Sequence, residues 1–316
     1  MHDILSSKLG WIVDNSARVN HARRVDLILT FAGFGVGVVV GLTGMGGGAL
    51  MTPLLVLAFG VPPLAAVSSD LAASAVMKPF GGWVHARRGT VNWSLVRWLC
   101  LGSVPSAFCG VLLARLLPEG AQVQHAIQVA LAVALVLAAA GMIAKVYLGR
   151  RRTALDRPAT IRVRPVPTVL LGALGGLVVG LTSVGSGSLM IVVLLMLYPA
   201  LRPNDLVGTD LVQAVPLVAS AALGHVFFGD LHLDLAATIL IGSIPGVLIG
   251  SRLSSRAPAG VVRAGLVAIL LTSAAKLFGA PNVAVLGAAG VAVVGAVVTL
   301  LVVRSRRPAP EPLAAH

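Results

Sequence analysis

The sequence predicts an all-α polytopic membrane protein with about 8–9 transmembrane helices in two homologous halves, each with a glycine-broken helix. Three observations support this fold class. Hydrophobic residues make up 57% of the 316 residues and charged residues 11%, and the mean hydropathy is +0.95. Apolar runs such as residues 126–143 approach the ~20 residues that cross a bilayer core. A glycine-rich stretch also occurs twice at a constant offset, since 180 − 41 and 187 − 48 both give 139.

The repeated stretch predicts an interrupted helix in each half. Residues 43–48 and their counterparts 182–187 are too rich in glycine to remain regular helix, because each glycine there costs about 1 kcal/mol relative to alanine. Before each copy, glycines at four-residue spacing line one helix face and let another backbone approach closely. These trios are Gly33, Gly37 and Gly41 in the first half, and Gly172, Gly176 and Gly180 in the second.

Polar and basic segments divide the chain in order. Residues 1–24 form a polar tail without the apolar centre of a signal peptide. The first transmembrane repeat covers 25–148, with a broken unit at 26–59, a turn at Val61-Pro62-Pro63 and spans at about 64–84, 93–117 and 123–148. A basic linker at 149–166 follows. The second repeat, 167–304, has a broken unit at 168–197, spans at about 205–228, 235–253 and 261–278 and an extra C-terminal helix at 283–303, before a polar tail at 305–316.

The repeat continues beyond the interruption with one inserted residue, so the offset becomes 140 (210 − 70). Ser69-Asp70-Leu71 then aligns with Thr209-Asp210-Leu211, and Gly102-Ser103-Val104-Pro105 aligns with Gly242-Ser243-Ile244-Pro245. Such matches over some eighty residues are hard to obtain from composition alone. We therefore interpret the chain as an internal duplication.

The net charge of +13 is distributed as in a membrane protein rather than a nucleic-acid-binding one. Basic residues cluster in short loops and tails, the pattern of the positive-inside bias. The loop with Arg87 and Arg88 is basic, whereas its counterpart around Asp230 and Asp234 is acidic. Opposite charge favours inverted repeats, but simple counting of spans does not produce the inversion, so the sequence leaves the orientation open.

The paired interruptions are the candidate substrate site. A half-helix that begins after each glycine cluster presents free N–H groups and a positive dipole end, and two such ends could bind an anion. The alternative is that the glycines only permit tight helix crossing. The candidate substrate-binding residues are Thr43, Gly44, Gly46, Gly47 and Gly48 in the first half, and Thr182, Ser183, Gly185, Ser186 and Gly187 in the second.

Asp70 and Asp210 are the acidic residues expected within the membrane, and they are repeat-equivalent. Carboxylates there often serve as proton relays, so both are candidates for proton coupling. The equally weighted alternative is that each one caps a helix start. Lys78 could attract an anion, although snorkelling of its long side chain to the interface is favoured. Gln213 could line the transport pathway.

The sequence contains no motif for a catalytic triad, a nucleotide, a cofactor or a metal ion. We therefore expect no enzyme activity, no cofactor and no metal site. Two rival interpretations stay open. An intramembrane enzyme would have to use Asp70 and Asp210 as its catalytic pair, and a non-transporting scaffold or assembly factor would use the glycines for packing alone.

The glycine-broken helix, the Ser/Thr-Asp-Leu triplet and the Gly-Ser-Val/Ile-Pro motif resemble the TauE/SafE sulfite exporter family, also called TSUP, over roughly residues 27–303. The matching residues are Gly41–Gly48, Gly180–Gly187, Asp70 and Asp210. The second half departs from the family pattern at Ser186 and Val192. The resemblance implies a multi-pass permease of the inner (cytoplasmic) membrane for sulfite, sulfonates or related small organic anions, coupled to an ion gradient. Its partners would be the small anion and the lipid bilayer, with no nucleic acid, and homo-oligomers are left open.

Overall fold

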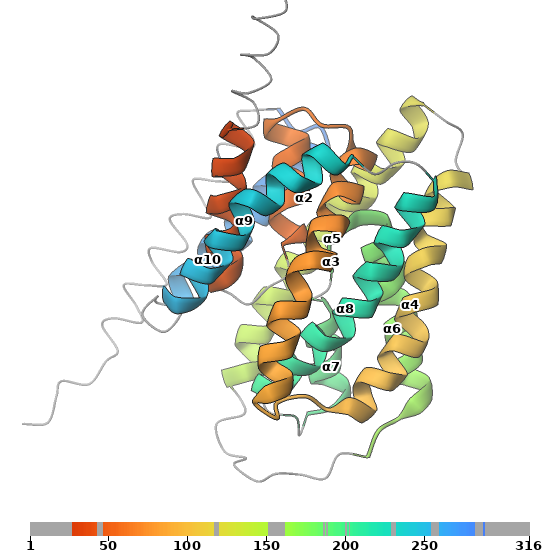
Figure 1. The fold of residues 1–316 in the computed structure, drawn as a ribbon. Helices are drawn as coiled ribbons and strands as arrows, with labels where there is room; N and C mark the ends of the chain where they lie inside the picture. The colour runs from red at the N-terminus through yellow and green to blue at the C-terminus, as the bar shows by residue number, and fades with distance from the viewer. Residues whose placement is uncertain are drawn as a thin grey trace, which may run out of the picture.

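The computed structural model describes residues 27–42, 47–116, 120–150, 162–185, 187, 189–199, 201, 203–228, 232–253, 259–281 and 287. Within these residues every regular element is an α-helix, as the composition predicts, and the helices pack into one bundle (Figure 1). The predicted tails at 1–24 and 305–316 lie outside the described residues. The predicted C-terminal helix at 283–303 also lies outside them, except for residue 287.

The helices follow the predicted order. An N-terminal helix, Leu27–Leu42, is followed by α2 (Gly48–Ala58), α3 (Pro63–Arg87), α4 (Trp93–Leu116) and α5 (Ala121–Arg150). Then come α6 (Pro165–Thr182), α7 (Leu189–Leu197), α8 (Pro203–Phe228), α9 (Leu233–Leu253) and α10 (Ala259–Leu277). Helix therefore ends at the second glycine cluster and restarts after it as α7, whereas at the first cluster α2 begins at Gly48 and residues 43–46 lie outside the described residues. The predicted linker at 149–166 is shorter in the structure, because α5 extends to Arg150 and α6 begins at Pro165. Of the residues between these two helices, 162–164 are described.

Five of the described helices are long and apolar enough to cross a membrane, judged by length and composition. Their spanning segments are Trp93–Leu116, Gln122–Ala144, Pro165–Thr182, Asp205–Phe228 and Leu233–Leu253. Shorter apolar helices are Leu27–Leu42, Gly48–Ala58 and Ala264–Leu277. Large apolar side chains such as Leu101, Leu174 and Leu248 are exposed on the outside of the bundle. A surface of this kind fits a lipid environment, so the chain is a multi-pass membrane protein.

The glycine trios do bring backbones together, and each trio meets a helix of the other half. Along α6, a Cβ added at the trio glycines would overlap backbone atoms of α4. The N-terminal helix lies against α9 in the same manner, and glycines of α4 and α9 face their partner helices in return. The facing pairs are Gly172 with Leu99, Gly176 with Ser103, Gly180 with Ala107, Gly37 with Ser243, Gly41 with Val247, Gly102 with Val169, and Gly246 with Phe34.

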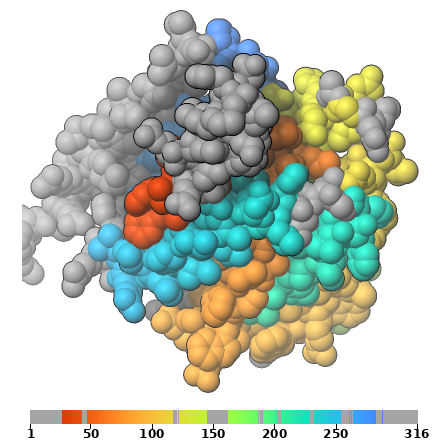
Figure 2. Space-filling view, turned by 45° about the horizontal axis from the view of Figure 1, so that its top comes forward, coloured from red at the N-terminus to blue at the C-terminus, as the bar shows by residue number. Residues whose placement is uncertain are grey.

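The two long helices α3 and α8 lie side by side and run in opposite directions (Figure 1). Near the end of α3, Gly82 faces Val215, and ten residues later the Asn92 N–H donates to the hydroxyl of Thr209 at 3.0 Å. Residues near and just after the end of α3 therefore contact residues progressively closer to the start of α8, as expected for two antiparallel helices. In the space-filling view α8 and α9 lie next to α3 on one face of the molecule (Figure 2).

Buried polar side chains concentrate in one region of the bundle. Most of them lie on α3 and α8, and the rest lie where α2, α4, α6 and α9 pack against these two helices. Apolar clusters surround this region, one built mainly from α3, α4, α7 and α8 and another from α2, α5 and α10. The buried polar residues of this region include Thr52, Ser69, Asp70, Lys78, Ser103, Ser183, Asp210, Gln213 and Ser243.

Candidate functional site

The interruption in the first half touches the interruption in the second half. Gly48, the first residue of α2, is packed so closely against Ser183 that an added Cβ would overlap the carbonyl oxygen of Ser183. Ser183 follows the last residue of α6 and is 5% exposed. Two stretches that are 135 residues apart in the chain (183 − 48) therefore form one buried junction.

Ser183 ends α6 with an unusual backbone conformation. Its φ of 59° lies in the left-handed region, which is uncommon for a residue other than glycine, and its N–H donates to the Val179 carbonyl at 2.7 Å. Thr182 stabilises the same helix end, because its hydroxyl lies 2.6 Å from the Val178 carbonyl oxygen and accepts from the Val184 N–H at 3.2 Å. The Thr182 hydroxyl is thus hydrogen-bonded to main-chain groups on both sides of Thr182.

Asp70 extends from α3 into this junction. Its Oδ2 accepts a hydrogen bond from the Ser183 hydroxyl at 2.6 Å and another from the Thr52 hydroxyl at 3.0 Å. The side chain is 1% exposed. One carboxyl oxygen therefore joins three helices, because Thr52 belongs to α2, Asp70 to α3, and Ser183 to the end of α6.

The second carboxyl oxygen of Asp70 lies beside the start of α2. Oδ1 is buried and accepts no hydrogen bond from the described residues, and the hydroxyl of the preceding Ser69 is also buried without a partner among them. An added Cβ on Gly47, the N-cap residue of α2, would lie 3.8 Å from Oδ1. Gly47 has no side chain to cap the helix, so the first N–H groups of α2 receive no hydrogen bond from the side chain of their N-cap residue.

These positions correct the capping interpretation. Helix α3 begins at Pro63 and α8 begins at Pro203, so Asp70 and Asp210 each lie two turns inside their own helix. Neither residue caps the start of the helix that carries it. Asp70 instead lies near the N-terminus of a different helix, α2, where the helix dipole favours negative charge.

Asp210 has different partners from Asp70. Its Oδ1 accepts a hydrogen bond from Gln213 Nε2 at 3.2 Å, and the Ser103 hydroxyl donates to Gln213 Oε1 at 3.3 Å. All three side chains are at most 2% exposed. Gln213 therefore links Asp210 on α8 to the Gly-Ser-Val-Pro motif of α4. The repeat-equivalent position of Gln213 in the first half is Ala73, so the two halves hold their carboxylates differently.

Lys78 is buried in the bundle and does not snorkel. Its side chain is only 8% exposed, and it interacts electrostatically with both Asp210 and Asp70. The snorkelling interpretation was therefore wrong. In the sequence a lysine next to a proline resembles an interfacial residue, but packing of α3 against α8 encloses the whole side chain.

Several sequence-predicted residues cannot be placed, and others have structural roles. Thr43, Gly44, Gly46 and Ser186 lie outside the described residues. Gly185 and Gly187 have φ values of 124° and 107°, which a side chain would strain. The interruption after α6 therefore requires glycine at these two positions.

Thr52 was not predicted as a residue of the site, and Ser103 was not predicted as one of its polar groups. Thr52 is a single threonine in an apolar segment, and no motif or spacing in the sequence indicates a role for it. Ser103 was visible only as part of a repeated motif. Among the described residues, no three histidine, cysteine, aspartate or glutamate side chains gather as a metal site.

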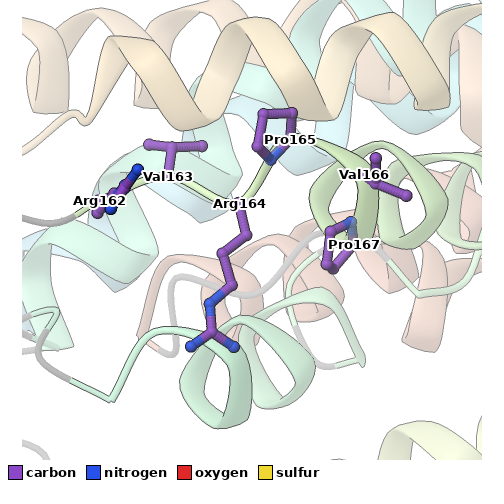
Figure 3. A pocket seen from close by; sticks show the side chains of 6 residues that line it. All are labelled: Arg162, Val163, Arg164, Pro165, Val166 and Pro167. Atoms are coloured by element: carbon purple, nitrogen blue, oxygen red, sulfur yellow. The ribbon is translucent and has the colours of Figure 1, made fainter.

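A shallow hollow lies elsewhere, at the start of α6. It is lined by the consecutive residues from Arg162 to Pro167, and the Arg164 side chain extends away from the two proline rings (Figure 3). None of these residues belongs to the junction of the interruptions. We therefore locate the candidate site at the junction rather than in this hollow.

Alanine at positions 47 and 48 should have different effects. Gly47→Ala places a methyl group in ordinary contact with Asp70 Oδ1, Met77 and Val40, so we expect normal insertion with altered anion transport. Gly48→Ala overlaps the Ser183 backbone and should destabilise the fold by about 1–3 kcal/mol. Thermal unfolding of both purified variants in detergent, together with transport assays, tests this contrast. Equal thermal stability of the two variants would contradict the close packing at Gly48.

Comparison with known proteins agrees with the resemblance of the motifs. A family model described as sulfite exporter TauE/SafE matches residues 29–277. The probable membrane transporter protein YjnA of Bacillus subtilis (strain 168) is 40% identical over 251 residues, covering 78% of this chain and 96% of that protein. The probable membrane transporter protein YdhB of the same organism is 24% identical over 249 residues, covering 78% and 97%. No solved structure matches the chain significantly. The chain therefore belongs to the TauE/SafE sulfite exporter family of membrane transporters.

Proposed function

We propose that the chain is a secondary transporter for a small anion, with sulfite, a sulfonate or a related organosulfur compound as its cargo. Family membership supports the transporter class, and the name of the family motivates the sulfur chemistry. The observation that carries the proposal is the buried Asp70 carboxyl group where both helix interruptions meet. Unwound backbone at membrane depth is typical of a transporter site.

The transporter would consist of two inverted repeats, residues 25–148 and 167–304, with about 8–9 transmembrane helices in the inner membrane. The antiparallel course of the repeat-equivalent helices α3 and α8 supports this arrangement. So does charge, because the end of α3, which is followed by the basic pair Arg87 and Arg88, lies at the opposite end of the bundle from the start of α9, whose first turn contains Asp234 (Figure 1).

Asp70 would make anion binding depend on a proton. The start of α2 offers N–H groups to an anion, but an ionised Asp70 at the same place repels it. A protonated Asp70 would instead carry a hydrogen on Oδ1, which has no hydrogen-bond partner among the described residues, and could donate it to an oxygen of the anion. Asp70 would then couple the anion to a proton gradient, and Asp210 would play the corresponding part in the other half.

The two rival functions have less support. An aspartic-protease-type pair shares one proton between its two carboxyl groups, whereas the hydrogen bonds that Asp70 accepts come from the hydroxyls of Thr52 and Ser183. A scaffold explains the close-packed glycines. It does not explain a buried carboxyl oxygen that has no hydrogen-bond partner among the described residues and lies beside a helix N-terminus, because such a group is unfavourable in a purely structural role.

Flux in proteoliposomes tests the proposal. We expect uptake or efflux of radiolabelled sulfite or a simple sulfonate such as methanesulfonate, with sulfate as the comparison anion, and we expect the rate to depend on a pH gradient. Liposomes that contain no protein provide the baseline. Flux at that baseline for every anion would reject the sulfur-anion assignment, whereas selective flux without any effect of the gradient would reject the coupling.

A further inference from the structure

Three elements meet at one position beside the start of α2. A carbon placed where Gly47 would carry its Cβ lies 3.8 Å from Asp70 Oδ1, 3.8 Å from the methyl carbon of Met77 and 3.9 Å from a methyl carbon of Val40. These are the nearest atoms among the described residues, apart from the chain neighbours of Gly47. Asp70 and Met77 belong to α3, and Val40 belongs to the N-terminal helix. A small carbon group at this position would therefore touch one carboxyl oxygen and two methyl groups.

One side of this position is polar. Asp70 is 1% exposed, and its Oδ1 has no hydrogen-bond partner among the described residues. The hydroxyl of Ser69, a residue that is 0% exposed, also has no partner among them. The first N–H groups of an α-helix such as α2 have no partner within the helix. Because buried polar groups without partners are unfavourable, two of them beside a helix start indicate a place for a polar ligand.

The other side of the position is apolar, and Met77 contributes to it. Met77 lies seven residues after Asp70, which is about two helical turns, so the two residues share a face of α3. The Ser243 hydroxyl donates to Met77 Sδ at 3.2 Å, and Ser243 is 1% exposed. Ser243 belongs to the Gly-Ser-Ile-Pro motif of α9. The motif of the second half thus holds the thioether of the first half while its methyl group faces the Gly47 position.

The corresponding contacts in the second half are different. Ser103, the equivalent of Ser243, donates to the amide oxygen of Gln213 at 3.3 Å instead of to a thioether. The equivalent of Met77 is Leu217 (217 − 77 is the repeat offset of 140), which is 0% exposed inside an apolar cluster. Met77 is only half-buried. The pairing of a carboxyl oxygen with a methionine methyl group is therefore a property of the first half.

We propose that Met77 is a specificity-determining residue of the anion site. The oxygens of the cargo face Asp70, Ser69 and the start of α2, and the remaining substituent of the cargo contacts the methyl group of Met77. Ser243 is a positioning residue, because it acts through the thioether. The inference rests on the proposed transport function and deepens it by naming the part of the cargo that Met77 recognises.

This arrangement predicts an order among small sulfur anions. Methanesulfonate has three oxygens for the polar side and one methyl group for the apolar side. Sulfate would place an oxygen against methyl groups, where that oxygen loses hydration without gaining a hydrogen bond. Sulfite has no fourth substituent, so it leaves the apolar contact unmade. We therefore expect methanesulfonate to bind most tightly, sulfite less tightly and sulfate least tightly.

Binding to the purified protein in detergent tests this order without requiring flux. Thermal unfolding is followed with increasing methanesulfonate, sulfite or sulfate at constant ionic strength, and the shift in Tm gives an apparent Kd for each anion. We expect methanesulfonate to bind at least about 10-fold more tightly than sulfate, the lower end of the range for one methyl group in an apolar pocket. Equal affinities for methanesulfonate and sulfate would overturn the inference.

Variants assign the preference to Met77 through the ratio of the two Kd values, which does not depend on the amount of active protein. Met77→Gln keeps the length of the side chain but presents an amide, so the preference for methanesulfonate over sulfate should fall by about 10-fold. Met77→Leu keeps an apolar contact and should preserve most of the preference. Ser243→Ala should lower it by about 3-fold, because a thioether sulfur is a weak acceptor.

Met196→Gln is the matched control, since it makes the same change at an exposed methionine of α7 and should keep the wild-type ratio. A wild-type ratio in a folded Met77→Gln would overturn the inference, as would an equal change in Met196→Gln. Flux in proteoliposomes then separates the two proposals. Selective binding of methanesulfonate without any flux would support the role of Met77 and reject the transport function. Flux of sulfur anions without a methanesulfonate preference would do the reverse.

Discussion

Asp70→Asn is expected to lower gradient-driven anion flux by about 100-fold while the protein still inserts and folds, because the amide cannot exchange the proton that would couple the anion to the gradient. Asparagine has nearly the shape of aspartate and can still accept from the hydroxyls of Thr52 and Ser183 through its amide oxygen. It cannot take up or release a proton. Any remaining flux should therefore not respond to a pH gradient.

The matched control is Asp234→Asn, which changes an exposed aspartate in the first turn of α9 and should leave flux unchanged. Both variants are measured in proteoliposomes at equal protein content, with and without a pH gradient. If the protein were a scaffold, Asp70→Asn would lower its stability instead of a transport rate. Normal gradient-dependent flux by an inserted Asp70→Asn would remove Asp70 from the coupling mechanism.

Gly37→Leu is expected to disrupt the pairing of the N-terminal helix with α9 and to destabilise the folded protein by about 3 kcal/mol. Gly37 is buried, and an added Cβ would lie 2.5 Å from the Ser243 carbonyl oxygen and 2.9 Å from its Cα. Backbone atoms cannot move aside as the tip of a flexible side chain can. The two helices would therefore have to separate along their whole contact.

Gly35→Leu on the same helix is the control, because Gly35 is exposed and no atom of another residue lies within 4 Å of the added Cβ. Thermal unfolding in detergent and the yield of monodisperse protein would compare the two variants. We expect Gly35→Leu to behave as wild type within the error of the assay. Similar losses in both variants would mean that glycine matters here for backbone flexibility rather than for close approach.

Much of the fold could be predicted because its signals are local. The spacing of Gly33, Gly37 and Gly41 indicated a face for close packing, and the structure places α9 against that face. The glycine cluster after α6 indicated an interruption, and the helix does end at Thr182 and restart at Leu189. Hydropathy and glycine spacing are properties of neighbouring residues, so they can be recognised without knowing what each helix contacts.

The candidate site could be predicted only in part. Asp70 and Ser183 were named from their positions, but their hydrogen bond joins residues that are 113 positions apart. Thr52 lies 18 positions from Asp70 in an otherwise apolar helix. No periodicity links such residues, because the contact exists only after helices of both halves have packed together.

The sequence by itself therefore determined the class of the protein, the order of its helices and the two interruptions, since length, hydropathy and glycine content restrict these directly. Only the tertiary structure decided which helix meets which glycine face, that α3 and α8 run antiparallel, and that the Lys78 side chain is buried. The physical reason is that burial and charge pairing depend on distances between segments that are far apart in the chain. Those distances are set by packing, and one lysine has the same sequence signal whether its side chain reaches the membrane surface or the centre of the bundle.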